Sequence, residues 1–321
     1  MLRNLLRLLV CMSCIAALPV LHAQDYPTRP VKIVVPYAPG GTSDFVARLI
    51  GQKLSERMSG SFIVENKAGA GGRLGFDAVA KAASDGYTLA STDSSFAMLP
   101  ALYASMPYQV GDLQPVSLLT QVPLVLVAAE KTGFKRLSDV LRYAKNNPGK
   151  LNYGSGGIGS ATHLAGELFS HAAEIKVTHI PYKGAGEAMK AVLAGEVDLL
   201  VTAAPTAAPH VKMGKVQGIV VTTVQRARAL PDIPTAAEAG LPGFSIAGWV
   251  GLSAPKGIPM AIVSRLHREA VAVLAQPDVI EKLNNLGAEA VGSTPEEFGR
   301  VIASETARWT EIVKAAAIKL E

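Results

Sequence analysis

Residues 31–54 read VKIVVPYAPGGTSDFVARLIGQKL, and this stretch contains a complete strand, loop and helix. Val31–Val35 is a short apolar run that Pro36 ends, so it predicts a buried strand. The loop Tyr37–Gly41 follows it. Apolar residues then recur at three and four spacing, which predicts one apolar helix face made of Phe45, Val46, Leu49, Ile50 and Leu54. A strand that enters a helix through a glycine-rich loop is the repeating unit of α/β folds.

The same alternation continues along the chain. We expect strands at 61–65, 87–91, 151–153, 176–180, 198–202 and 218–223, and helices at 73–83, 138–146, 162–172 and 186–194. Residues 91–95 read STDSS and are expected to form a polar loop after the third strand. The pattern predicts the α/β class, with helices around mostly parallel sheets.

Two apolar stretches are placed to connect two domains. Residues 116–129 read as a strand that leaves the first lobe, and residues 245–253 as the strand that returns to it. About 300 residues exceed what one hydrophobic core serves, which also favours two domains. We therefore expect two crossing strands to act as a hinge between lobe 1, residues 24–122 and 250–321, and lobe 2, residues 123–249. Thr294–Glu297 is a capping box that begins a closing helix.

Residues 1–23 have the pattern of a signal peptide. Arg3 and Arg7 precede an apolar run too short to span a membrane, and cleavage is expected near Ala23. A lipoprotein cut at Cys14 is the alternative. Both cysteines, Cys11 and Cys14, lie in this leader, so the mature chain is expected to form no disulfide. The predicted compartment is the periplasm.

Composition and motifs argue against several classes of function. The formal net charge of +5 falls to +3 without the two leader arginines, and there is no basic run, so no nucleic-acid partner is expected. The mature sequence holds no nucleophile elbow, zinc-protease motif or P-loop. His163 and Glu167, four apart on a helix, fall short of a metal site, which needs three or four ligands. We expect no enzyme, no metal and no cofactor.

Two glycine-rich loops each follow a strand and open a helix: residues 39–44 and residues 154–160. A helix N-terminus carries unpaired amide groups and a partial positive charge, so it attracts an anion. Each loop alone could also be an ordinary tight turn. Gly154, Gly156 and Gly159 also fit a dinucleotide fingerprint, which leaves a nucleotide-binding enzyme as the alternative. The acid that would confirm it is missing from the end of the next strand, Ile180.

Motifs along the whole mature chain resemble one family, the Bug-type extracytoplasmic solute receptors, which are the TctC-like receptors of tripartite tricarboxylate transporters. The resembling segments are YPTRP at 26–30, VVPYAPGGTSD at 34–44, VENKAGAGG at 64–72, DGYTL at 85–89, YGSGGIGS at 153–160, HLAGELF at 163–169, PYKG at 181–184, DIPTAAEAG at 232–240 and GSTPEEF at 292–298. The resemblance implies a two-lobe periplasmic binding protein of the Venus flytrap kind, type II-like, that captures a small carboxylate.

The resemblance also implies a site, a partner and a ligand range. The ligand-binding residues that it nominates are Tyr37, Ala38, Pro39, Gly40, Gly41, Asp44, Ser91, Asp93, Ser155, Gly156, Ser160, Ala161, Thr162, His163, Pro181, Tyr182, Gly184, Thr202 and Ala203. The implied partners of the monomer are the large and small integral subunits of a transporter. The ligand is expected to be a dicarboxylate or tricarboxylate, or an aromatic or aliphatic monocarboxylate. Residues 201–204 lack an acid that many relatives carry there, which argues against an amino-acid ligand.

Overall fold

The βα units of the sequence form the two halves of the protein in the computed structural model, which describes residues 26–315. The predicted signal peptide lies outside these residues. The first half contains β1 (Val31–Val35), α2 (Thr42–Met58), β2 (Phe62–Asn66), α3 (Arg73–Ala80), β3 (Thr88–Asp93) and α4 (Ser94–Leu102). The second contains α5 (Leu137–Asn146), β5 (Asn152–Ser155), α6 (Ala161–Ala172), β6 (Thr178–Pro181), α7 (Ala185–Ala194), β7 (Leu199–Ala203), α8 (Ala204–Lys212) and β8 (Val216–Val221).

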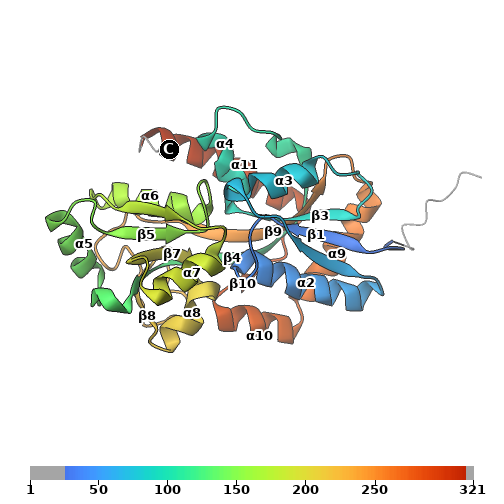
Figure 1. Ribbon diagram of the computed structural model, residues 1–321. Helices are drawn as coiled ribbons and strands as arrows, with labels where there is room; N and C mark the ends of the chain where they lie inside the picture. The colour runs from blue at the N-terminus through green and yellow to red at the C-terminus, as the bar shows by residue number, and fades with distance from the viewer. Residues whose placement is uncertain (1–25, 316–321) are drawn as a thin grey trace, which may run out of the picture.

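Two long strands connect the halves, as the sequence predicts. The strand β4 (Leu113–Ala129) pairs over its first part with β9 (Ala247–Pro255), and over its second part with β7 and β8. The strand order is β2-β1-β3-β9-β4-β7-β5-β6. We call the part around β1, β2 and β3 lobe one, and the part around β5, β6, β7 and β8 lobe two (Figure 1). Since β4 belongs to both sheets, the predicted boundaries at 122–123 and 249–250 stay a prediction.

Strand direction explains where the helix starts lie. Within lobe one, β1 is parallel to β2 and β3, and within lobe two, β5 is parallel to β6 and β7. Only the crossing strands and β10 (Glu289–Ala290) add antiparallel pairs. In parallel units the loop after each strand leads into the next helix at the same edge of the sheet. The helices that follow the parallel strands, which are α2, α3 and α4 in lobe one and α6, α7 and α8 in lobe two, therefore begin at the edge that faces the other lobe.

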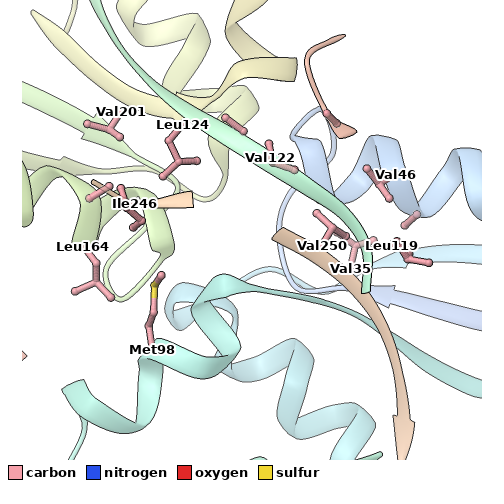
Figure 2. Packing of buried hydrophobic residues seen from close by; sticks show 14 of the residues in the cluster. Val35, Val46, Met98, Leu119, Val122, Leu124, Leu164, Val201, Ile246 and Val250 are labelled. Carbon is pink, nitrogen blue, oxygen red and sulfur yellow. The ribbon is translucent and has the colours of Figure 1, made fainter. Parts of the chain in front are cut away.

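The hydrophobic core runs through the crossing strands without a break between the lobes. Leu119 and Val122 on β4 lie on the lobe-one side, and Leu124 on the same strand lies towards lobe two (Figure 2). Met98 on α4 and Leu164 on α6 belong to the same buried cluster and lie near each other in Figure 2. The lobes thus share buried apolar surface beside the hinge, which resists their complete separation.

The C-terminal part closes lobe one. Here α9 (Met260–Leu274), α10 (Pro277–Leu286) and α11 (Pro295–Ala315) follow β9. The predicted capping box is confirmed: the Thr294 amide donates to Glu297 Oε2 at 2.9 Å, and the Glu297 amide donates to Thr294 Oγ1 at 3.1 Å. Within residues 26–315, no helix combines the length and apolar character needed to cross a bilayer.

Several local predictions need correction. Residues 91–93 complete β3 and residues 94–95 begin α4, so the expected polar loop is wrong. The helices α4 and α8 escaped prediction because each contains a proline, Pro100 or Pro209, which usually ends a helical pattern. Phe45 is 36% exposed rather than part of the buried face of α2. The strand expected from 176 begins only at Thr178.

Candidate functional site

A cavity lies where the two lobes meet the crossing strands. Its volume is about 80 Å³, and roughly 10–15 Å³ is enough for one water, so a small organic ion fits. Both lobes and both crossing strands contribute its walls. The lining residues are Tyr37, Ala38, Gly41, Thr42, Ser43, Asp44, Asp93, Ser94, Val122, Leu124, Gly156, Ser160, Ala161, Thr162, Ala185, Ala203, Gly248, Trp249 and Val250.

Five helices begin at this cavity. The lining set includes the first residues or the N-cap of α2, α4, α6, α7 and α8. The N-caps of three of them, α2, α7 and α8, are Gly41, Gly184 and Ala203, and none of these makes a side-chain capping hydrogen bond. Their first-turn amides are therefore available to a ligand, except at Pro205 of α8, which has no amide hydrogen. Converging amides and helix dipoles make the cavity a site for a negatively charged group.

No cationic side chain takes part in that attraction. Among the described residues that line the cavity, none is lysine, arginine or histidine. Asp44, in the first turn of α2, is held by Arg48 and by the Asn66 amide, and it accepts the Gly40 amide at 3.1 Å. Burial opposes ionisation, but these hydrogen bonds and the guanidinium keep the pKa of Asp44 below its ordinary value. Asp44 thus orders the loop before α2 while its charge is balanced.

The glycine loop of lobe two satisfies most of its own amides. The Gly156 amide donates to Thr162 Oγ1 at 2.9 Å, and the Gly157 amide donates to Ser155 Oγ at 3.1 Å. The Gly159 amide donates to His163 Nδ1 at 3.2 Å. Since these donors are occupied, the ligand-facing donors of this segment lie at the start of α6 rather than along the loop.

An aromatic stack supports this loop from within lobe two. The imidazoles of His163 and His179 lie 4.1 Å apart, and the Tyr153 ring stacks on His179. Ser155 Oγ is 2.6 Å from His179 Nε2, and the Tyr153 hydroxyl donates to Glu167 Oε1 at 2.7 Å. Among residues 26–315, no three acidic, histidine or cysteine side chains converge as metal ligands. Both imidazoles act as neutral packing groups.

The buried imidazoles predict an acid-sensitive stability. Burial lowers the pKa of His163 to about 4 and that of His179 to about 3, and the neighbouring imidazole contributes to the second shift. In the unfolded chain both imidazoles take up a proton near pH 6.5. Between that pH and the lower pKa values of the folded protein, the unfolded chain therefore binds more protons than the folded one. Stability is therefore lost as the pH falls below 6.5. We expect the free energy of unfolding to drop by about 3 kcal/mol between pH 7 and pH 5.

Urea unfolding at pH 7, 6 and 5 measures this loss. His171 is exposed on α6, so His171→Gln serves as the control. It should leave the change of the free energy of unfolding with pH as it is in the wild type. A free energy of unfolding that is flat from pH 7 to pH 5 would contradict the burial of two neutral imidazoles.

The predicted site residues divide into two groups. The cavity brings together Tyr37, Ala38, Gly41, Asp44, Asp93, Gly156, Ser160, Ala161, Thr162 and Ala203. The remainder lie outside its lining set: Pro39, Gly40, Ser91, Ser155, His163, Pro181, Tyr182, Gly184 and Thr202. Several of the second group instead hold the first in place, as Ser155 and His163 do through the hydrogen bonds of the lobe-two loop.

Pro39, from the second group, lies with several neighbours where the lobes touch. The Ala38 amide donates to the Lys183 carbonyl at 3.3 Å, and Thr42 Oγ1 lies 3.1 Å from Thr206 Oγ1. A Cβ on Gly186 would stand 3.0 Å from the Pro39 carbonyl oxygen. These contacts join the start of α2 to the starts of α7 and α8, so they exist only while the lobes are together.

Sequence reasoning missed much of the wall. Val122, Leu124, Gly248, Trp249 and Val250 come from the crossing strands. Trp249 lines the cavity, and its ring also meets Phe298 edge to face at 5.3 Å. Its Nε1 is buried and has no hydrogen-bond partner among the described residues, so this indole keeps an unsatisfied donor. The sequence did predict that both crossing strands form the hinge, and this was the signal that could have placed their residues beside the cavity.

The fold and the cavity together define a class: a two-lobed α/β binding protein that encloses a small anion between its lobes. A family model described as "Tripartite tricarboxylate transporter family receptor" matches residues 46–318. The chain belongs to this family, the TctC receptors, as its motifs indicated. Receptors of this family work outside the cytoplasm, and they are substrate-binding rather than catalytic proteins.

Relatives and solved structures agree with this assignment. BugT of Bordetella pertussis is 36% identical over 302 residues, covering 93% of each chain. A protein encoded between tcbD and tcbE in Pseudomonas sp. strain P51 is 39% identical over 290 residues, 90% of this chain and 86% of the relative. Rpa4515 of R. palustris, solved with adipate, is 35% identical with a TM-score of 0.89, covering 92% of this chain and 99% of that one.

A second liganded structure comes from the same organism. MatC from Rhodopseudomonas palustris with bound malate is 35% identical with a TM-score of 0.86, and the match covers 90% of this chain and all of the other. Both neighbours were solved with carboxylates, which agrees with a cavity formed by helix N-termini.

Proposed function

We propose that this protein captures a small carboxylate in the periplasm and delivers it to the integral subunits of a tripartite tricarboxylate-type transporter, without chemistry of its own. The observation that carries the proposal is the convergence of five helix starts from both lobes on one cavity, with no basic side chain among the lining residues that the structure describes. The carboxylate would accept hydrogen bonds from the amides at the starts of α2 and α6. Ordered water can bridge the remaining distance at little cost.

Capture would depend on closure of the lobes. Contacts such as the Ala38 amide with the Lys183 carbonyl require both lobes, and a ligand that touches both would favour the closed state over the open one. The closed surface would then be recognised by the membrane subunits, with the receptor acting as a monomer. Small-angle scattering should show a more compact particle with saturating ligand, and identical profiles would count against closure.

A thermal-shift screen tests the proposed function. A ligand that binds only the folded protein raises the melting temperature. We expect a shift with members of a carboxylate panel that includes malate and adipate, and none with nicotinamide nucleotides. The nucleotide-binding alternative would require the amides of Gly156, Gly157 and Gly159, which already donate to side chains. A shift with nucleotides alone would overturn the proposal, and native mass spectrometry of protein from its own periplasm can identify a retained ligand.

A further inference from the structure

The cavity contains one acid that pairs with no cation among the described residues. Asp44 and Asp93 are the acidic side chains among the described lining residues. Asp44 forms an ion pair with Arg48 at 2.9 Å, whereas no ion pair joins Asp93 to any residue of 26–315. Asp93 is 9% exposed, so water does little to screen it. An anion-binding cavity that keeps such an acid must receive something other than a second anion beside it.

Neutral donors surround Asp93. Its Oδ1 accepts the Ser95 amide at 3.0 Å and the Ser95 hydroxyl, while the Tyr37 hydroxyl lies 2.6 Å from Ser95 Oγ and 3.3 Å from Oδ1. Its Oδ2 accepts the Ser43 hydroxyl at 3.2 Å. Burial raises the pKa of Asp93, while these hydrogen bonds favour the ionised form. A carboxylate oxygen can accept about two hydrogen bonds, so Oδ2 retains room for one more donor.

Asp93 also distinguishes the start of α4 from the other helix starts at the cavity. As the N-cap of α4, its carboxylate offsets the positive end of that helix. The starts of α2, α7 and α8 have no such cap. The ligand's carboxylate is therefore attracted to the helix starts other than that of α4, and the part of the ligand near Asp93 meets an acceptor.

We propose that Asp93 makes the cavity selective for a monocarboxylate that carries a hydrogen-bond donor, a hydroxyl or an ammonium, at its other end, and makes it disfavour dicarboxylates. This inference rests on the proposed function, since it assumes that a carboxylate occupies the cavity. Asp93 supplies an acid at the cavity wall, whereas residues 201–204 contain none. Ligands that carry an amino group are therefore candidates again.

Calorimetry with ligands of equal length tests the selectivity. One set is succinate, 4-hydroxybutanoate, 4-aminobutanoate and butanoate; the other is adipate, 6-hydroxyhexanoate, 6-aminohexanoate and hexanoate. In the wild type, we expect the best donor-bearing ligand to bind about tenfold or more tightly than the dicarboxylate of the same length, because like charges at close range disfavour a complex. The hydroxyl and ammonium compounds then distinguish the two kinds of donor.

Asp93→Asn is the matched variant. Asparagine is isosteric and also caps helices well, so α4 should persist, and an unchanged melting temperature verifies this. We expect the variant to bind dicarboxylates about tenfold more tightly and donor-bearing ligands about tenfold more weakly. Glu196→Gln removes the same charge from an exposed position of lobe two and should change neither.

The possible outcomes distinguish a failure of this inference from a failure of the proposed function. If the wild type binds dicarboxylates as tightly as donor-bearing ligands, or if Asp93→Asn keeps the wild-type selectivity, the role of Asp93 is wrong while carboxylate capture stands. If no carboxylate binds the wild type, the proposed function fails and this inference fails with it.

Discussion

Gly71→Ala is expected to raise the dissociation constant for a bound carboxylate about 100-fold, because the closed form then carries a backbone clash that opening relieves. Gly71 lies in the short helix η2 (Ala70–Gly72) of lobe one. A Cβ on it would stand 2.2 Å from the Ile158 carbonyl oxygen and 2.9 Å from the Gly159 carbonyl carbon, both in lobe two. Backbone atoms cannot rotate away as a side chain can, so the lobes must part.

Gly133→Ala is a matched control for this prediction. Gly133 has φ +67°, against +65° for Gly71, and a Cβ there would meet nothing within 4 Å. Both substitutions add the same left-handed backbone strain, roughly 1–2 kcal/mol, but only the first blocks the lobe contact. Titration calorimetry with the tightest carboxylate of the panel measures the affinities. Equal dissociation constants for the two variants would contradict a closed binding state.

Gly41→Asp should abolish most carboxylate binding by placing an acid of the chain where the ligand's carboxylate belongs. Gly41 is the N-cap of α2, with φ −92° and ψ 175°, a backbone geometry in which aspartate caps well. A Cβ there has room, since its nearest neighbour, Ala185 Cβ, would be 3.5 Å away. The new carboxylate would accept the first-turn amides itself, so we expect a loss of affinity of about 100-fold or more.

Stability distinguishes this effect from damage to the fold. Capping offsets the repulsion from Asp44, so the free energy of unfolding should stay within about 1 kcal/mol of the wild type. Gly41→Ala adds the same Cβ without a capping oxygen and should retain far more affinity. If the aspartate and alanine variants bind equally, the amides at the start of α2 do not hold the ligand.

Local patterns predicted the elements well where one face or one motif dominates. Val31–Val35 is a strand with the bounds that its apolar run predicts, and the capping box at Thr294 and Glu297 begins α11. The long β4 was also recognised, despite Pro123 within it. By contrast, the first six residues of α4 are all buried and Pro100 lies within the helix, so α4 shows no amphipathic period. Its role at the cavity could not be seen from the sequence.

The sequence by itself determined the order of strands, glycine-rich loops and helices, the two crossings and the family. The elements and loops follow from residues a few positions apart, whose spacing the backbone geometry dictates, and the family follows from short motifs spread along the chain. Only the tertiary structure decided that five helix starts share one cavity, that Trp249 forms its wall and that Asp93 lacks a cation there. Such facts depend on residues as distant as Thr42 and Thr206, 164 positions apart, whose meeting results from the docking of two lobes rather than from any local pattern.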